Sequence, residues 1–286
     1  MEYLAHLAVV IGIYGILTTS LNLVSGYAGL VTLSHGAFYA AGAYAVAILT
    51  KFHGVNFFAA MVVGALVAAV LAAVFGVVLS RFRGDYYLLV SIGVQFIATI
   101  TLLNWQSFTN GPFGISGIAR PAGEIFQSTL GYLLLTAIIF ALVYIVARHL
   151  VGSPYGRVLK AIREDEEAIR VFGYRTEWFK HSIYVMSAMM AALAGALFAA
   201  YFSFIDPWSF AIAESILILV MVILGGLANL KGSLLGAVVL VLLPEFLRFV
   251  GFAPEIAAHT RLGIYGLLLI LLMLYRPQGL IGEYKL

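Results

Sequence analysis

Apolar segments of about 20 residues recur along the whole chain, and an α-helix needs about that length to cross about 30 Å of hydrocarbon. Only 10% of the residues are charged and 63% are hydrophobic, whereas a soluble domain carries about a quarter charged residues. We therefore predict an all-α polytopic membrane protein with about eight to ten transmembrane helices. The predicted spans are 4–24, 30–50, 57–79, 85–104, 130–148, 182–204, 211–229, 233–250 and 262–275.

The charged residues are concentrated in one stretch, 151–181. The chain has 16 basic and 13 acidic residues, and this stretch holds six of the basic and five of the acidic ones. Both of its flanks are long apolar segments, so the stretch is predicted to lie outside the bilayer. With strict alternation of nine spans, twelve Lys and Arg fall on the side of this stretch and four on the other side. Positive charge favours the cytoplasmic side, which predicts a cytoplasmic 151–181 stretch and C-terminus and an N-terminus outside.

The same stretch has the features of a structured helix rather than of a solvated basic loop. Ser153 followed by Pro154 is typical of a helix start, and Gly173 is typical of a helix end. One apolar stripe at helical spacing, with Glu166 in its middle, consists of Leu159, Ile162, Ile169 and Phe172. Opposite charges at i,i+4 form the pairs Lys160/Glu164, Arg163/Glu167 and Glu166/Arg170. Such a helix is suited to a groove in a soluble protein.

Two glycine-rich stretches resemble each other loosely. Residues 29–36 read GLVTLSHG and residues 226–232 read GLANLKG, and a Gly-Ala pair follows each. Glycine and polar residues at the edge of hydrophobic runs in two halves indicate broken helices and internal repeats. Irregular backbone at membrane depth is stable only when it is buried in protein or lines a wet cavity. The alternative is a pair of ordinary turns between helices.

Polar side chains in the predicted spans either line a pathway or hold helices together. Gln95 and Thr99 share one helix face because they lie four residues apart. For His35 the alternatives are a substrate or proton-relay contact and a hydrogen-bonding group at a helix end. The candidate pathway residues are Ser34, His35, Gln95, Thr99 and Asn104.

Residues 105–129 form the longest non-spanning stretch on the predicted outer side. An Asn-Gly-Pro sequence and repeated glycines indicate turns there. The stretch is either a tolerated external loop or a short lid or docking surface over the outer mouth of a pathway.

Charged residues are nearly absent from the predicted spans, and Glu214 is expected near the outer end of its helix. A carrier driven by protons or sodium usually needs carboxylates inside the membrane. The chain also lacks cysteine, a Walker-type loop, a zinc-protease motif and a Ser/His/Asp arrangement. We therefore expect no enzyme activity, no cofactor and no metal. Transport through this chain is either passive or driven by a partner.

Four segments carry a resemblance to a known family: LNLVSGYAGLVTLSHGAFYAAGAYAVAIL, SPYGRVLKAIREDEEAIRVFGY, SAMMAALAGALFAAYFSFIDPWSF and LVMVILGGLANLKGSLLGA. In this order they resemble the permease subunits of bacterial branched-chain amino acid ABC importers, of the LivM type. The resemblance covers about residues 20–280. Its most specific part is GRxxxAIREDExAxxxxG, because helices rich in alanine and glycine alone would be a weak signal.

The resemblance implies a single transmembrane permease domain over 1–286 in the inner membrane of a bacterium or archaeon. Its implied partners are a second homologous permease, two cytoplasmic ATPase subunits and an extracytoplasmic binding protein, with no nucleic acid. The implied substrates are Leu, Ile and Val, and the implied source of energy is ATP hydrolysis by the partners. The alternative from the residues is a passive channel for a small neutral solute such as urea or an amide, which has no need of the charged stretch.

The resemblance also implies that 154–173 is a coupling helix in an ATPase cleft. Its coupling residues are Arg157, Ile162, Arg163, Glu164, Asp165, Glu166, Glu167, Ala168, Ile169, Phe172 and Gly173. Compared with the common Glu-Ala-Ala form of such helices, Ile169 replaces the second alanine, and the position stays apolar.

Overall fold

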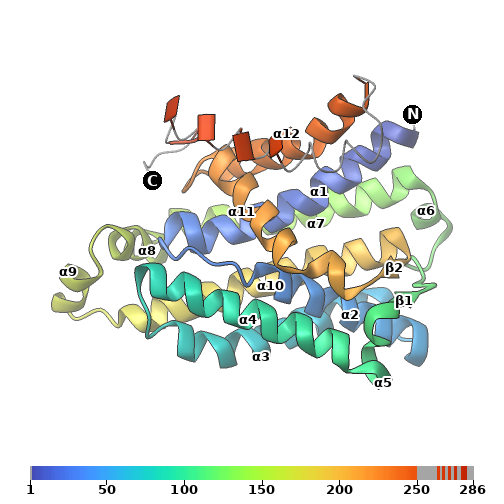
Figure 1. The fold of residues 1–286 in the computed structure, drawn as a ribbon, viewed down its shortest axis with the longest axis horizontal. Helices are drawn as coiled ribbons and strands as arrows, with labels where there is room; N and C mark the ends of the chain where they lie inside the picture. The colour runs from blue at the N-terminus through green and yellow to red at the C-terminus, as the bar shows by residue number, and fades with distance from the viewer. Residues whose placement is uncertain are drawn as a thin grey trace.

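The computed structural model describes residues 2–249 and, further on, 263–264, 266–267, 270–271, 274–275 and 278–281. This part of the chain is almost entirely helical, with one short pair of β-strands (Figure 1). The elements are α1 (Glu2–Asn22), the π-helical turn η1 (Leu23–Tyr27), α2 (His35–His53), α3 (Phe57–Leu79), α4 (Gly84–Asn104), α5 (Gln106–Thr109), the 3-10 turn η2 (Gly111–Phe113), β1 (Ile115–Ser116), α6 (Glu124–Gln127), α7 (Thr129–Gly152), α8 (Pro154–Glu164), α9 (Glu166–Val171), α10 (Thr176–Phe202), β2 (Phe204–Ile205), the 3-10 turn η3 (Pro207–Phe210), α11 (Ile212–Gly225) and α12 (Leu230–Phe249).

Six helical segments in the described ranges are long and apolar enough to cross a membrane: Glu2–Tyr27, Phe57–Leu79, Gly84–Asn104, Thr129–Gly152, Thr176–Phe202 and Pro207–Gly225. The prediction of an all-α polytopic membrane protein is therefore confirmed. Two more predicted spans, 30–50 and 233–250, overlap α2 and α12. The ninth, 262–275, lies largely outside the described residues.

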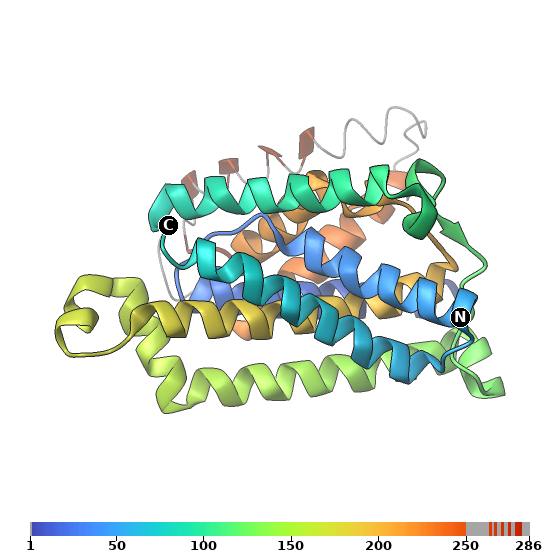
Figure 2. The ribbon, with the colours of Figure 1, turned by 90° about the horizontal axis from the view of Figure 1, so that it is seen from below.

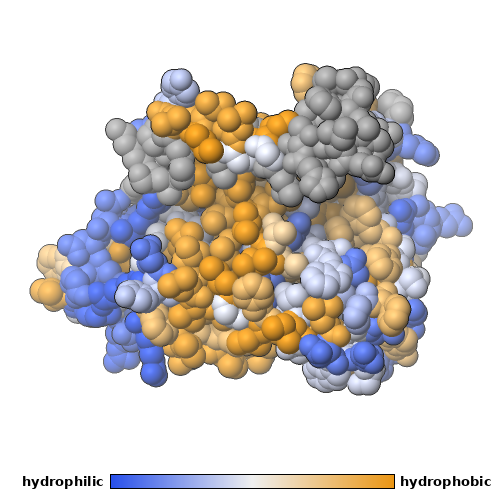
Figure 3. All heavy atoms as spheres, in the orientation of Figure 1, coloured by the Kyte–Doolittle hydropathy of each residue, from blue (hydrophilic) through white to orange (hydrophobic). Residues whose placement is uncertain are grey.

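The long helices lie side by side in one bundle with two different ends (Figures 1 and 2). One end carries α8 and α9, and the other carries the N-terminus, α5, α6 and the β-strands. An apolar band separates two hydrophilic ends on the face shown in Figure 3. The α8 end holds ten of the Lys and Arg in residues 2–249 whose side chains are described: Arg81, Arg83, Arg148, Arg157, Lys160, Arg163, Arg170, Arg175, Lys180 and Lys231. The other end holds Lys51 and Arg120, a distribution that favours the predicted cytoplasmic position of the α8 end.

The centre of the bundle is α10, which packs against α2 and α3. Its alanines and Gly195 allow close contact between backbones: a Cβ atom added at Gly195 would collide with the carbonyl oxygen of Tyr39 on α2. Small residues serve this purpose in membranes, where close packing rather than exclusion of water holds helices together. The small residues of α10 thus allow α2 to pack closely against it at the middle of the bundle.

Residues 105–129 form an ordered cap over the outer end rather than an unstructured loop. Strand β1 pairs antiparallel with β2, and Ile115 lies opposite Ile205. The Lys51 ammonium, at the end of α2, donates to the carbonyl of Ser116 at 2.6 Å. The cap therefore joins α2 to the connection between α10 and α11.

Two helices begin inside the bundle instead of at its ends. Residues 28–34 run non-helically from the α8 end to the middle of the molecule, where α2 starts (Figure 2). Residues 206–211 lead from the cap to the start of α11, also in the interior (Figure 1). The broken-helix interpretation therefore holds for the first glycine-rich stretch. In the second, residues 226–229 form a tight turn and residues 230–232 are the start of α12, so the two stretches have different conformations.

Candidate functional site

The charged stretch folds as two short helices and not as the single helix predicted over 154–173. Helix α8 begins as expected, because the Ser153 hydroxyl accepts a hydrogen bond from the Gly156 N–H at 3.4 Å. It ends at Glu164, and Asp165 adopts an extended conformation with φ −153° and ψ 97°. The Asp165 carboxylate then caps α9 by accepting from the Ala168 N–H at 3.0 Å. Aspartate competes well for such capping positions, which explains the break.

The break divides the predicted apolar stripe into an inner part and an outer part. The prediction of one continuous stripe on a single helix face is therefore wrong. Leu159 and Ile162 on α8 are buried against the protein. Phe172 and its neighbour Val171, beyond the break, are 78% and 87% exposed. Helix α10 also begins at Thr176, so the last residues of the predicted 151–181 stretch form its first turns.

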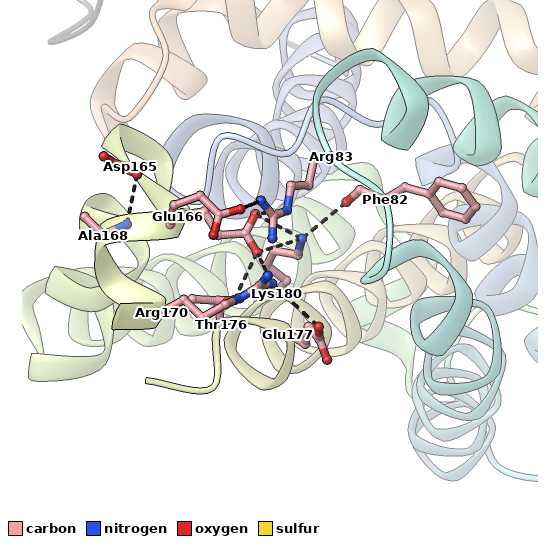
Figure 4. A network of polar contacts seen from close by, with 10 residues as sticks. Phe82, Arg83, Asp165, Glu166, Ala168, Arg170, Thr176, Glu177 and Lys180 are labelled. Atoms are coloured by element: carbon pink, nitrogen blue, oxygen red, sulfur yellow. Dashed lines mark hydrogen bonds and ion pairs between the residues drawn. The ribbon is translucent and has the colours of Figure 1, made fainter. Parts of the chain in front are cut away.

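Glu166 is the centre of a polar network that holds this element in place (Figure 4). Its carboxylate, with a side chain 13% exposed, accepts from the Thr176 hydroxyl at 2.9 Å and from the Lys180 ammonium at 3.3 Å. Arg170 and Arg83 approach the same carboxylate at 3.3 and 3.2 Å. The network thereby joins α9 to α10 and to the turn between α3 and α4. The Glu166/Arg170 pair predicted from the sequence is confirmed.

Lys180 and Arg83 extend the network in opposite directions. Lys180 is 1% exposed, and its ammonium also donates to the Phe82 carbonyl at 3.2 Å. Arg83 is partly exposed and pairs with Glu167 as well as Glu166. The hydrogen bond from Arg83 lowers the pKa of Glu167, and the same bond raises the pKa of Arg83. Of the two acidic partners, Glu166 is only partly exposed and Glu167 lies at the surface.

Helix α8 also contacts the segment that leads into the membrane. The Arg163 guanidinium donates to the Gly26 carbonyl, and the Lys160 ammonium lies 5.5 Å from the centre of the Tyr27 ring. Gly29 has φ +70°, and a Cβ atom there would lie 2.7 Å from Cγ of Arg163. These contacts connect α8 to residues 28–34 and through them to the start of α2.

Four of the five candidate pathway residues lie together at the starts of α2 and α11. Ser34, His35, Gln95 and Thr99 are buried. His35 Nε2 lies 2.7 Å from the Ser20 hydroxyl, and the Ser34 hydroxyl lies 2.7 Å from that of Tyr184. The Gln95 amide donates to the Phe210 carbonyl at 2.7 Å and Thr99 binds the carbonyl of Gln95 at 3.0 Å. The fifth residue, Asn104, is exposed and bonds within its own helix.

Ser215 and Asn22 complete this interior and were not singled out from the sequence. The Ser215 hydroxyl accepts from the Gly36 N–H at 2.9 Å and donates to Gln95 at 3.2 Å, which joins the first turns of α2 and α11. The Asn22 side chain accepts from the Ala228 N–H at 3.0 Å and donates to Ser233 at 2.6 Å. A polar residue in the first turn after a Pro-containing loop, as at Ser215, is the signal that could have found one of them.

Glu214 lies deeper than expected. Its carboxylate accepts from the hydroxyl of Tyr14, in the middle of α1, at 2.7 Å. Because α11 starts in the interior, the first turn of that helix lies at mid-membrane depth and not near the outer surface. Glu214 is the one expected exception to spans free of deep charged residues, and the expectation that it lies near the outer side is corrected. Within the described residues, no group of three or more His, Asp and Glu side chains is arranged to hold a metal ion.

An apolar groove of about 570 Å³ separates α4 from α2 and α3. Alanines of α2 form one wall and Val94, Ile97 and Ala98 of α4 form the other. Gln95 and Thr99 point away from it, because the groove is lined by the neighbouring positions on α4. The groove is thus distinct from the polar cluster.

Comparison with known proteins gives matches over nearly the whole chain. Residues 3–273 match the family described as the branched-chain amino acid transport system permease component. The chain is 35% identical to the high-affinity branched-chain amino acid transport system permease protein LivM of Escherichia coli, over 94% of this chain and 68% of that protein. It is 26% identical to a probable branched-chain amino acid transport permease protein LivM of Methanocaldococcus jannaschii, over 95% of this chain and 91% of that protein. It is 23% identical to the permease protein LivH of E. coli, over 94% of this chain and 91% of that protein. No solved structure matches.

Proposed function

The chain belongs to the family of permease components of branched-chain amino acid transport systems, and from this membership we propose that it forms half of the translocation pathway of an ATP-driven importer for Leu, Ile and Val. It is a multi-pass protein of the cytoplasmic membrane. A transport permease is not an enzyme, so we assign ATP hydrolysis to partner subunits. Similarity to both LivM and LivH proteins supports a second, homologous permease as the other half.

The observation that carries the ATP-driven proposal is the exposed tip of α9. Val171 and Phe172 are large apolar side chains that project from a charged element at the cytoplasmic end, where Figure 3 shows apolar atoms among hydrophilic ones. Exposed apolar groups rimmed by polar residues mark protein interaction sites. A passive channel has no need of such a surface, and the family match also favours a permease over a channel.

We assign the ATPase contact to the outer part of the predicted coupling residues. Phe172, with Val171 beside it, would enter the ATPase cleft, and Arg157, Glu164 and Glu167 would surround it as exposed charges. Ile162, Arg163 and Glu166 would not contact the ATPase. They would hold α8 and α9 in position against the membrane helices. The remaining members shape the backbone or complete the surface: Asp165, Ala168, Ile169 and Gly173.

At the opposite end, the cap formed by residues 105–129 and the α10–α11 connection is the proposed surface for the extracytoplasmic binding protein. Phe113 and Trp208 are exposed there. Aromatic side chains are enriched at protein interfaces, and this end faces outward by the distribution of Lys and Arg. These exposed aromatic side chains favour the docking-surface alternative for residues 105–129 over a tolerated external loop.

Co-purification tests the proposal. The tagged chain, extracted from native membranes in mild detergent, is expected to bring a second permease and two ATP-hydrolysing subunits. The double variant Val171→Asp/Phe172→Asp is expected to lose the ATPases and keep the second permease. The control Phe113→Asp places one such charge on an exposed aromatic at the other end, and it should keep both the second permease and the ATPases. Recovery of the wild-type chain alone would contradict the importer and support a passive channel.

A further inference from the structure

Glu214 is a carboxyl group inside the membrane that the transport proposal leaves without a role. Tyr14 donates a hydrogen bond to one of its oxygens at 2.7 Å. Among the described residues, no Lys, Arg or His forms a salt bridge with it. A charged group at this depth is costly unless it has a partner or water. The described part of the chain therefore supplies a carboxyl group at this depth and no basic side chain that forms a salt bridge with it.

Tyr39 is a second polar group whose surroundings point to a ligand. Its side chain is 1% exposed, and its hydroxyl has no hydrogen-bond partner in the described part of the chain. A buried phenol normally finds one. The Tyr39 ring packs 4.9 Å from that of Phe210, directly before α11. Helix α2, which carries Tyr39, contacts helix α11, which carries Glu214.

Glu214 and Tyr14 are both partly exposed, as are Val10 and Leu217, one turn away on the same two helices. Ionisable residues inside the membrane almost always face the bundle interior or a water-filled cavity rather than lipid, which favours a position facing the pathway for this part of α1 and α11. The surface combines one carboxylate, phenol oxygens and aliphatic side chains.

We propose that Glu214, Tyr14 and Tyr39 bind the α-ammonium group of the transported amino acid at the middle of the membrane. This site rests on the proposed import of branched-chain amino acids. A primary ammonium has three N–H donors, and the carboxylate and the two phenol oxygens are matching acceptors. Val10 and Leu217 then lie where a branched aliphatic side chain would rest. The interaction is non-covalent and needs no further reactant.

The test is equilibrium binding of radiolabelled L-leucine to the purified complex of this chain with its permease and ATPase partners, without the binding protein. Glu214→Gln is expected to weaken leucine binding by about tenfold or more, because a hydrogen bond between charged groups is lost. The matched control is Glu245→Gln, which changes the carboxyl that pairs with Tyr3 at the outer end of α1 and should bind leucine normally. Isoamylamine, which keeps the ammonium, should compete with leucine, and 4-methylpentanoate, which lacks it, should not.

Tyr39→Phe keeps the test decisive if Glu214→Gln does not assemble. It removes only a hydroxyl without a partner among the described residues, so the complex should form normally and bind leucine several times more weakly. Normal leucine binding by an assembled Glu214→Gln or Tyr39→Phe complex overturns the site. So does equal competition by 4-methylpentanoate, or a wild-type complex that imports leucine without binding it. A wild-type complex that imports no branched-chain amino acid refutes the proposed function itself.

Discussion

The ammonium of Lys180 lies 3.3 Å from a carboxylate oxygen of Glu166, and this pair joins the cytoplasmic element to the membrane helices. Glu166 begins α9, whereas Lys180 lies on the second turn of α10. Because Lys180 also binds the Phe82 carbonyl, the pair ties three parts of the chain at one point. A movement of α9 would therefore pass to α10 and to the α3–α4 turn.

We predict that Glu166→Gln destabilises the protein by about 3 kcal/mol, because it leaves the buried Lys180 without its counter-charge. The measurement is the free energy of unfolding in mixed micelles. Glu167→Gln is the control, since it makes the same change one residue further on, where the carboxylate is exposed. The double change Glu166→Gln/Lys180→Met should recover much of the loss. Equal stability of the two single variants would contradict the central role of Glu166.

Acid titration should separate the exposed carboxylate from the rest of the network. The hydrogen bond from Arg83 lowers the pKa of Glu167, so the contact stabilises the fold above the ordinary glutamate pKa of about 4.3. That contribution disappears as the pH falls through the lowered pKa of the folded state. The difference in melting temperature between wild type and Glu167→Gln, at low ionic strength, should therefore be present at pH 6 and vanish on acidification. A difference that grows at low pH would contradict this assignment.

Gly29→Ala should uncouple ATP hydrolysis from transport. The new Cβ would press on Arg163 and disturb the contact between α8 and residues 28–34. We expect ATPase activity to persist while import per ATP falls by about fivefold or more. Gly54→Ala is the matched control, because Gly54 also has positive φ but has no atom within 4 Å of the added Cβ. Similar loss of coupling in both variants would attribute the effect to backbone strain alone.

Gln95→Leu should reduce the amount of folded complex and transport in parallel. The change leaves the Phe210 carbonyl without its donor and removes the acceptor of Ser215, at a cost of about 1–2 kcal/mol. Thr99→Val should have a smaller effect, because Thr99 mainly binds a carbonyl of its own helix. Yield by size-exclusion chromatography and uptake in proteoliposomes measure the two quantities. Normal yield with lost uptake would instead support a pathway-lining role for Gln95.

The charged stretch shows how far local patterns reach. Ser153 and Pro154 predicted the start of α8 correctly, because a cap depends only on neighbouring residues. The same reasoning extended the helix through Asp165, where the aspartate instead caps a second helix. It also paired Glu166 only with Arg170, although Lys180, Thr176 and Arg83 meet the same carboxylate. Those partners come from other elements, and no local spacing reveals them.

By itself, the sequence determined that this protein is a helical membrane protein and which stretch stands outside the apolar spans, and it predicted which end faces the cytoplasm. These properties follow from segment length, apolar content and the distribution of Lys and Arg, all of which act locally along the chain. Only the tertiary structure decided that α2 and α11 begin in the interior, that Ser215 joins them and that Glu214 lies at mid-membrane. Depth and partnership depend on how the helices pack, because a break in a helix shifts the position of every residue that follows it.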